Sequence, residues 1–208
     1  MSIGAVLLAA GAAERLGRRP KCLLLLDGVP LVRRVHQALA AAGIDEIVVV
    51  IGHHGDAVAA ALAGSGAVII RNPDPDHGQV SSQRIGLAAV TGAHEAVIVA
   101  LADQPLIEAD DIEDLIDAWQ ERSEGIAVVL PFVDGHRGNP VILAASVRQE
   151  ILSGAADFGG RQWQAAHPEQ VAPYVTENLH YGVDIDSAED IARFEAETGR
   201  QLHWPPGL

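Results

Sequence analysis

Four cations lie close together near the amino terminus, at Arg15, Arg18, Arg19 and Lys21. They follow a small, glycine-containing segment that begins at Gly11, after a short apolar run. Such a loop presents backbone N–H groups, and grouped N–H donors form a concave site for an anion. Lys21 is the only lysine of the chain, and its compact ammonium suits a phosphate. We therefore expect a polyphosphate-binding loop rather than a solvated basic one.

Acidic side chains follow two segments that we expect to be extended. Asp103 comes directly after the apolar run 96–102, and Asp184 and Asp186 alternate with apolar residues, so that both aspartates point to the same side. Open α/β sheets bind ligands at the carboxyl ends of their strands. Mg²⁺ takes one or two protein carboxylates together with substrate phosphates. The pattern predicts a Mg²⁺ ligand at Asp103, with helix capping as the alternative role.

The composition is that of a globular protein and limits its partners. The chain has 208 residues, 49% of them hydrophobic, and we expect one domain over 1–208. A net charge of −14 argues against nucleic acid and anionic membranes as partners. The apolar runs are too short to span a bilayer. A single cysteine, Cys22, and a first strand that begins at residue 3 predict a cytoplasmic protein without a leader.

Apolar runs of strand length alternate with helix-period segments, which predicts one three-layer, Rossmann-like α/β fold. Its sheet should be mostly parallel, with helices on both faces. We expect Asp56 to cap the second helix and Ser187 to cap the last one, in a capping box with Asp190. Expected strands are 3–9, 46–52, 67–71, 95–102, 126–132 and 171–175, and expected helices are 30–43, 56–62, 78–90, 110–122, 146–152 and one after 187.

The amino-terminal loop resembles the signature of the molybdenum cofactor nucleotidyltransferases. That signature reads Leu-Ala-Ala/Gly-Gly-x-Ser-x-Arg-Met/Phe-Gly and is followed shortly by lysine. The matching residues here are Leu8, Ala9, Ala10, Gly11, Arg15, Leu16, Gly17 and Lys21. Ala13 stands where the family has serine. The dinucleotide fingerprint Gly-x-Gly-x-x-Gly is absent after this first strand, so binding of NAD by that mechanism has little support.

Four later segments resemble the same family in the same order. They are Ser81, Ser82, Gly86 and Leu87 in a helix start, Ala102 to Pro105, Arg137 to Val141, and Asp184 to Asp190. Asn139 replaces the family's histidine. Residues 157–161 resemble a loop that contacts the pterin substrate, with Ala156 in place of its first glycine. The serine pair could instead cap its helix, and 157–161 could be an ordinary loop.

The resemblance implies a transfer of CMP from CTP to the phosphate of molybdopterin, with Mg²⁺ and release of pyrophosphate. It also implies a recipient molybdoenzyme as a partner. It implies metal ligation by Asp103 and Asp186, with Asp184 as a second candidate, and a preference for CTP from Ala10. The implied catalytic residues are Arg15, Lys21 and Asp103. The implied nucleotide contacts are Leu8, Ala9, Ala10, Gly11, Arg15, Lys21, Ser81, Ser82 and Gly86. The implied acceptor contacts are Asn139, Asp157, Gly159 and Arg161.

Three alternatives stay open at this point. The acceptor could be another phosphorylated molecule, such as a sugar, a polyol or a phosphonate, since Asn139 and Ala156 depart from the family. The chain could be a catalytically silent nucleotide-binding or chaperone-like subunit for a molybdoenzyme. An NAD-binding module is the third. The histidines His53 and His54 could bind a metal, but loop polarity is the better explanation, since no further ligand neighbours them at a useful spacing.

Overall fold

The apolar run at the start of the chain forms the central strand of the sheet. In the computed structural model, which describes residues 2–207, β1 (Ile3–Ala9) is buried at every position. It pairs in parallel with β4 (Ile47–Ile51) on one side and with β6 (Ala96–Leu101) on the other. A strand covered on both faces is apolar throughout instead of alternating, and these three strands have that pattern.

The main sheet has eight strands in the order β10-β7-β9-β6-β1-β4-β5, with β8 paired to β7. β9 runs antiparallel to both of its neighbours, β6 and β7, whereas the other pairs along this path are parallel. The predicted mostly parallel sheet is confirmed. The remaining strands of this sheet are β5 (Val68–Arg71), β7 (Val128–Val133), β8 (His136–Arg137), β9 (Val141–Ala144) and β10 (Val171–Val175).

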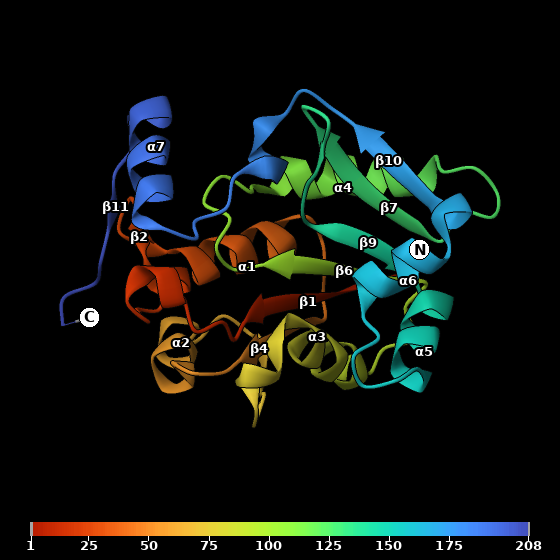
Figure 1. The fold of residues 1–208 in the computed structure, drawn as a ribbon, viewed down its shortest axis with the longest axis horizontal. Coiled ribbons are helices and arrows are strands. Elements are labelled where there is room, and N and C mark those ends of the chain that lie inside the picture. The colour runs from red at the N-terminus through yellow and green to blue at the C-terminus, as the bar shows by residue number, and fades with distance from the viewer. Residues whose placement is uncertain (1, 208) are drawn as a thin grey trace.

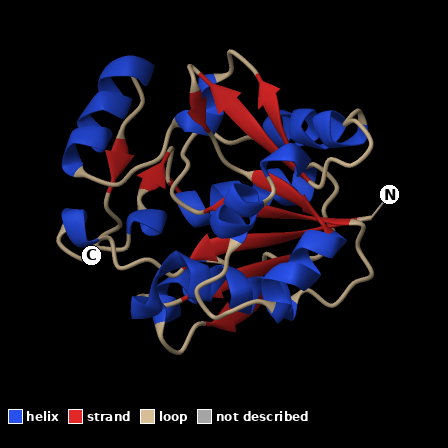
Figure 2. Cartoon of the chain, turned by 45° about the vertical axis from the view of Figure 1, so that its right-hand side comes forward, coloured by secondary structure: helices blue, strands red, loops and turns tan. Residues whose placement is uncertain are grey.

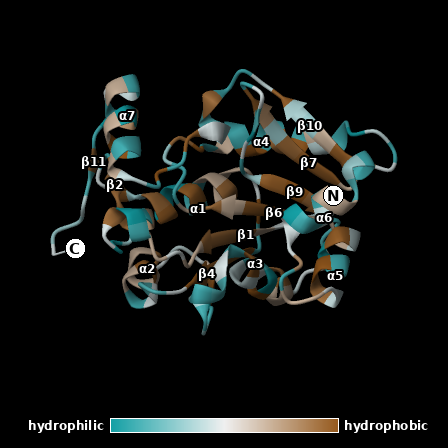
Figure 3. Cartoon of the chain, viewed as in Figure 1, coloured by the Kyte–Doolittle hydropathy of each residue, from teal (hydrophilic) through white to brown (hydrophobic). Residues whose placement is uncertain are grey.

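Helices cover both faces of this sheet, as predicted (Figures 1 and 2). Apolar side chains of α1, α2 and α4 pack in one core cluster, and those of α3, α5 and α6 pack in the other. The hydropathy colours show the central strands as a hydrophobic layer between these helices (Figure 3). The helices are α1 (Leu31–Ala41), α2 (Gly55–Ala61), α3 (Gly78–Ala89), α4 (Ala109–Gln120), α5 (Ala145–Ser153), α6 (Gly160–Ala166) and α7 (Ala188–Thr198).

A second, three-stranded sheet lies beyond the ends to which the β1 and β6 arrows point (Figure 1). It consists of β11 (Leu202–His203), β2 (Leu25–Leu26) and β3 (Val29–Pro30) in that order. With α7 it encloses a third cluster, which includes the buried side chains of Leu26, Ile185 and Phe194. The carboxyl-terminal segment is therefore packed down, with the Arg19 guanidinium 3.8 Å from the ring centre of Trp204.

Two local predictions need correction, and one is confirmed. Asp56 does not cap α2, because the helix begins one residue earlier. Asp56 Oδ1 instead lies 2.5 Å from Arg71 Nη2. Residues 160 and 161, expected to belong to the loop 157–161, instead begin α6. Ser187 caps α7 as predicted, with Asp190 completing the capping box. Within residues 2–207, no helix combines the length and apolarity needed to cross a membrane.

The carboxylate of Glu46, the residue before β4, lies at the end of the sheet opposite the carboxyl ends of β1 and β6. It accepts hydrogen bonds from Thr91 N and Oγ1 at 2.7 Å, from Gly92 N at 2.9 Å and from His94 Nε2 at 2.6 Å. Burial alone would raise the pKa of Glu46, but these donors outweigh burial and lower it to about 2. The ionised carboxylate thus ties the residue before β4 to the residues after α3.

Glu46→Gln should lower the free energy of unfolding at pH 7 by about 1–3 kcal/mol, because the neutral amide has one acceptor oxygen where the charged carboxylate pairs these donors with two. The native pKa lies below the ordinary value of 4.5, so this stabilisation is complete above pH 4.5 and is lost as the pH falls towards 2. Urea unfolding at pH 7 and at pH 3 should show the difference between variant and wild type shrinking. The exposed Glu124→Gln is the control, and an equal loss at both pH values would contradict this account.

Candidate active site

The parallel strands β1 and β6 end at the same edge of the sheet, and a cavity of about 480 Å³ opens there. The loop after β1 lines one side, and residues that follow β6 line the other. Of the residues implied by the resemblance, the lining includes Leu8, Ala9, Ala10, Gly11, Lys21, Ser82, Asp103, Asn139, Arg161 and Asp186. Asp184 is there as well. Segments that are distant in the sequence therefore meet in one cavity.

Lys21 lies between two of the predicted metal ligands. Its Nζ is 2.5 Å from Asp103 Oδ2 and also donates to Asp186 Oδ1. Burial lowers the pKa of Lys21, but the two carboxylates outweigh burial and raise it to about 12. The ammonium is therefore charged at neutral pH and holds the two aspartates together.

The carboxylates retain capacity for a divalent cation. Asp103 Oδ1 is buried and has no hydrogen-bond partner among residues 2–207. Partial burial is the largest cause that raises the pKa of Asp184 above its ordinary value, and the negative charges of Asp103 and Asp186 raise it further. No group of three or more acidic, histidine or cysteine side chains within the described residues is placed to hold a metal by itself. One or two protein carboxylates are enough for Mg²⁺, which takes its remaining ligands from phosphate and water.

The loop after β1 is held close to the exit of β4. A Cβ at Gly52 would lie 2.5 Å from the Ala10 carbonyl oxygen and 2.9 Å from Pro75 Cβ, so only glycine allows this approach. His54 Nε2 lies 2.7 Å from the Arg18 carbonyl oxygen and fixes the basic end of the loop. His54 therefore contacts the loop, and neither histidine belongs to a group of three or more metal-ligating side chains among residues 2–207.

The serine pair at the start of α3 is fixed by a buried asparagine. Asn72 Nδ2 donates to Ser81 Oγ and to Ser82 Oγ, both at 2.9 Å. Neither serine caps the helix, so the capping alternative is wrong. Ser82 lines the cavity, whereas Ser81 donates to the Gly78 carbonyl oxygen at 2.9 Å. Gly86 lies outside the lining, where a Cβ would be 2.4 Å from Val6 Cγ1, so its role is to let α3 pack on β1.

A second cavity of about 660 Å³ adjoins the first. The two share Leu8, Gln79, Leu101, Asn139 and Arg161. Apolar side chains from β6, β7 and β9 line part of it, and none of its lining residues within 2–207 carries a carboxylate. Its polar side chains include the amides Gln79, Gln83, Gln162 and Gln164 and the guanidinium groups of Arg137 and Arg161.

Some of the implied residues lie outside both cavities. Arg15 is exposed on the short helical turn η1 (Glu14–Leu16), and Asp157 and Gly159 precede α6. The sequence did not identify other lining residues, such as His53 and Asp76 of the first cavity. His53 Nε2 lies 3.1 Å from Asp76 Oδ1. The sequence also did not identify the glutamine amides of the second cavity, although two of them follow Gly78 at the helix start that had been singled out.

These features define the class of protein: an α/β fold of the nucleotidyltransferase type, in which the loop after β1, the Lys21 ammonium and a group of aspartates surround one cavity. The MobA-like NTP transferase domain matches residues 5–171, and the chain belongs to that family.

One curated relative is similar along most of its sequence, and two solved structures are similar in fold. Nicotine blue oxidoreductase of Paenarthrobacter nicotinovorans is 31% identical over 192 residues, covering 90% of this chain and 94% of that protein. A nucleotidyl transferase from Methanothermobacter thermautotroptrophicus has a similar fold, with a TM-score of 0.76, 24% identity and 94% and 97% of the two chains covered. The manganese complex of Rv0371c from Mycobacterium tuberculosis gives a TM-score of 0.74 at 23% identity, with 93% and 97% covered.

Lys21→Met should destabilise the ligand-free protein by about 1–3 kcal/mol, because it leaves Asp103 facing other carboxylates without a counter-charge. Added Mg²⁺ should raise the melting temperature of this variant more than that of the wild type. Thermal unfolding with and without Mg²⁺ measures both effects. Arg15→Met, an exposed cation of the same loop, is the matched control, and identical melting curves for the two variants would refute the counter-charge role.

Proposed function

We propose that this protein transfers CMP from CTP to the terminal phosphate of molybdopterin, forming the cytosine dinucleotide and releasing pyrophosphate. The supporting observation is the pair of adjoining cavities. The first combines the loop after β1 and the Lys21 ammonium with carboxylates, and the second combines amides, guanidinium groups and an apolar wall, with no carboxylate from residues 2–207 in its lining. Asn139 and Arg161 line both, so an acceptor in the second cavity would present its phosphate next to a nucleotide in the first.

The reaction needs positioning and charge neutralisation more than it needs a protein nucleophile. An oxygen of the acceptor phosphate forms a bond to the α-phosphorus of CTP, while the bond from that phosphorus to the bridging oxygen of the β-phosphate breaks and pyrophosphate leaves. Asp103 and Asp186 would hold Mg²⁺, which would neutralise charge on the phosphates. Lys21 and the N–H groups near Gly11 would orient the triphosphate and stabilise its developing charge.

The second cavity suits the pterin part of the proposed acceptor. A pterin is a flat ring with N–H and C=O groups at its edge, which side-chain amides recognise by donating and accepting hydrogen bonds. Gln83 Oε1 already accepts from Gly160 N at 2.8 Å, so this amide is held in a fixed orientation. Arg137 Nη1 donates to Gln164 Oε1 at 2.9 Å, which fixes a second amide. Arg161 is exposed at the boundary of the cavities and would contact the acceptor phosphate.

The proposed function is tested by measuring pyrophosphate release with Mg²⁺ and CTP, GTP, UTP or ATP, each with and without molybdopterin that carries molybdate. Release with CTP only, and only when the pterin is present, is the expected result. Binding of CTP without release in the presence of the pterin would point to another phosphorylated acceptor, such as a sugar, polyol or phosphonate. Absence of nucleotide binding would favour a silent subunit that delivers cofactor to a molybdoenzyme.

Asp103→Asn should reduce turnover by at least about 100-fold, because the neutral amide is a poor Mg²⁺ ligand beside the transferred phosphate. Steady-state pyrophosphate release at saturating CTP measures the loss. The variant should unfold in one cooperative transition like the wild type, which a denaturant curve checks. Wild-type turnover in this variant would remove Asp103 from the metal site.

Ala10→Gly should shift the preference from CTP towards GTP. Ala10 is buried, lines the first cavity and lies against Gly52, so loss of its methyl group leaves more room for a purine. The ratio of kcat/KM for CTP and GTP should fall about 10-fold or more, the size of discrimination that one methyl group supplies. Ala12→Gly, which also lines this cavity, is the control for added backbone freedom. An unchanged ratio would remove Ala10 from base selection.

A second candidate function comes from the relative named nicotine blue oxidoreductase, which matches 90% of this chain. This second candidate function is the oxidation or reduction of a small organic molecule bound in the second cavity. The Lys21–Asp103–Asp186 group favours the transferase instead, because a redox reaction does not need paired carboxylates around an ammonium. Oxidation of NADH or NADPH in the presence of nicotine blue, with no pyrophosphate release from any nucleotide, would select the oxidoreductase.

A further inference from the structure

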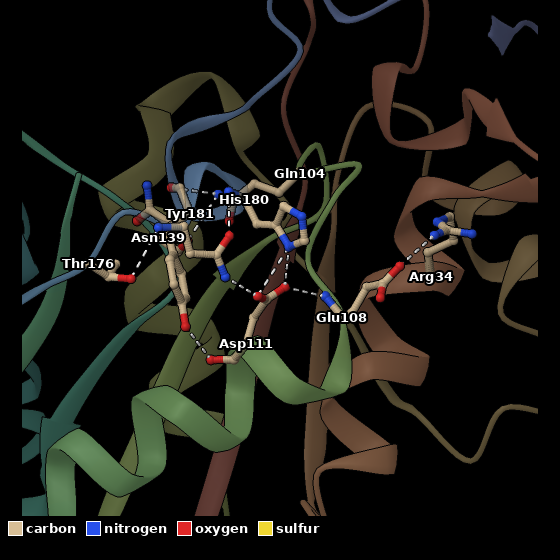
Figure 4. Close-up of polar contacts among 9 residues, drawn as sticks. Arg34, Gln104, Glu108, Asp111, Asn139, Thr176, His180 and Tyr181 are labelled. Atoms are coloured by element: carbon tan, nitrogen blue, oxygen red, sulfur yellow. Dashed lines mark hydrogen bonds and ion pairs between the residues drawn. The ribbon is translucent and has the colours of Figure 1, made fainter. Parts of the chain in front are cut away.

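A buried carboxylate outside both cavities holds the chain segment that leads to Asp184 and Asp186. Asp111, in the first turn of α4, is only 3% exposed. Its carboxylate accepts from Glu108 N at 2.8 Å, from Asn178 Nδ2 at 2.6 Å and from His180 Nδ1 at 3.0 Å (Figure 4). The bond from Glu108 belongs to the capping box of α4, but the bonds from Asn178 and His180 come from a segment far along the chain.

Tyr181 continues this connection towards the active site. Its hydroxyl donates to the Asp111 carbonyl oxygen at 2.7 Å, and burial raises the pKa of Tyr181, so that the hydroxyl stays protonated as a donor. The Tyr181 carbonyl oxygen accepts from Asn139 N at 2.9 Å and from Gln104 Nε2 at 3.1 Å. Gln104 Nε2 also donates to the Asn139 carbonyl oxygen at 3.1 Å. We call Asp111, Asn178, His180 and Tyr181 the Asp111 clamp.

The clamp is followed directly by the segment 183–186. The Ile185 side chain is fully buried and its N–H donates to the Asp103 carbonyl oxygen at 3.1 Å, while Asp184 and Asp186 line the first cavity. No member of the clamp lines either cavity. The clamp therefore contacts no substrate, but it joins α4 to the backbone that presents Asp186 opposite Asp103.

We propose that the Asp111 clamp is a set of positioning residues that fixes the segment 183–186 and Asn139 relative to Asp103. Its consequence for the reaction rests on the proposed function, since Asp186 is there a metal ligand and Asn139 an acceptor contact. Partners that orient metal ligands change metal affinity on the order of 10- to 100-fold when they are removed. The clamp acts in this way through the backbone.

His180 is the member to substitute first, because its side chain is 37% exposed and its removal leaves no large void. In His180→Ala, exchange of the Ile185 amide hydrogen should become at least about 10-fold faster. The affinity for Mn²⁺ in the presence of CTP should fall on the order of 10-fold, while the melting temperature stays close to that of the wild type. His180→Gln keeps a side-chain N–H donor and should restore both properties. His203→Ala, an exposed histidine on β11, is the matched control.

Hydrogen exchange and Mn²⁺ titration together separate the outcomes. Unchanged exchange at Ile185 in His180→Ala would overturn the clamp, whatever the activity of the protein. Faster exchange with unchanged Mn²⁺ affinity would overturn its role in positioning the metal ligands. A wild-type protein that binds neither CTP nor Mn²⁺ would contradict the proposed function and, with it, the metal role of the clamp, whereas exchange at Ile185 would still report whether the clamp holds the segment.

Discussion

The ion contacts of Lys21 with Asp103 and Asp186 are the interaction on which the site depends. They join a loop that follows β1, the end of β6 and a segment near the carboxyl terminus. Carboxylates brought together at the edge of a sheet repel one another and lose hydration, and both effects oppose folding. A single ammonium between them offsets this repulsion in the absence of ligand. The same charge is suited to a phosphate, so the residue that stabilises the ligand-free site is also a candidate ligand for its substrate.

The pairing of parallel strands is sufficient to bring the rest of the site together at their carboxyl ends. β1 and β6 are neighbours in the sheet, so the loop that follows one and the aspartate that follows the other must lie close together. Gly52 and Gly86 allow the loop and α3 to approach β4 and β1 more closely than any other residue would. The antiparallel strand β9, together with its neighbours β6 and β7, then provides the apolar wall of the second cavity. One fold thus supports two adjoining cavities, and the side chains that line them determine the reaction.

Much of this arrangement was predictable from local sequence pattern. A fully apolar run identified β1, and the alternation over 183–186 correctly placed Asp184 and Asp186 on one side, since both line the first cavity. Asp103 directly follows the expected strand 95–102, which was likewise sufficient to predict that this aspartate lies where the strand ends.

What escaped prediction depends on contacts between distant segments. Helix α6 is short, and its glycine-rich start resembles a loop, so tertiary packing of Trp163 rather than local propensity stabilises it. Asp56 has the residue type of a helix cap, but an ion contact with Arg71 on β5 takes its carboxylate. The Asp111 clamp involves residues about 70 positions apart, as in the bond from Tyr181 to Asp111, and no periodicity marks such a pair.

On the proposed function, Lys21 takes the place of a divalent cation between Asp103 and Asp186 until a nucleotide binds. A crystal structure with CTP and Mn²⁺, in which anomalous scattering locates the metal, tests this exchange. One Mn²⁺ should be bound directly by oxygen atoms of Asp103 and Asp186, with the Lys21 ammonium moved onto a phosphate of CTP. A metal bound elsewhere, or Lys21 still between the two carboxylates with CTP in the cavity, would contradict this exchange.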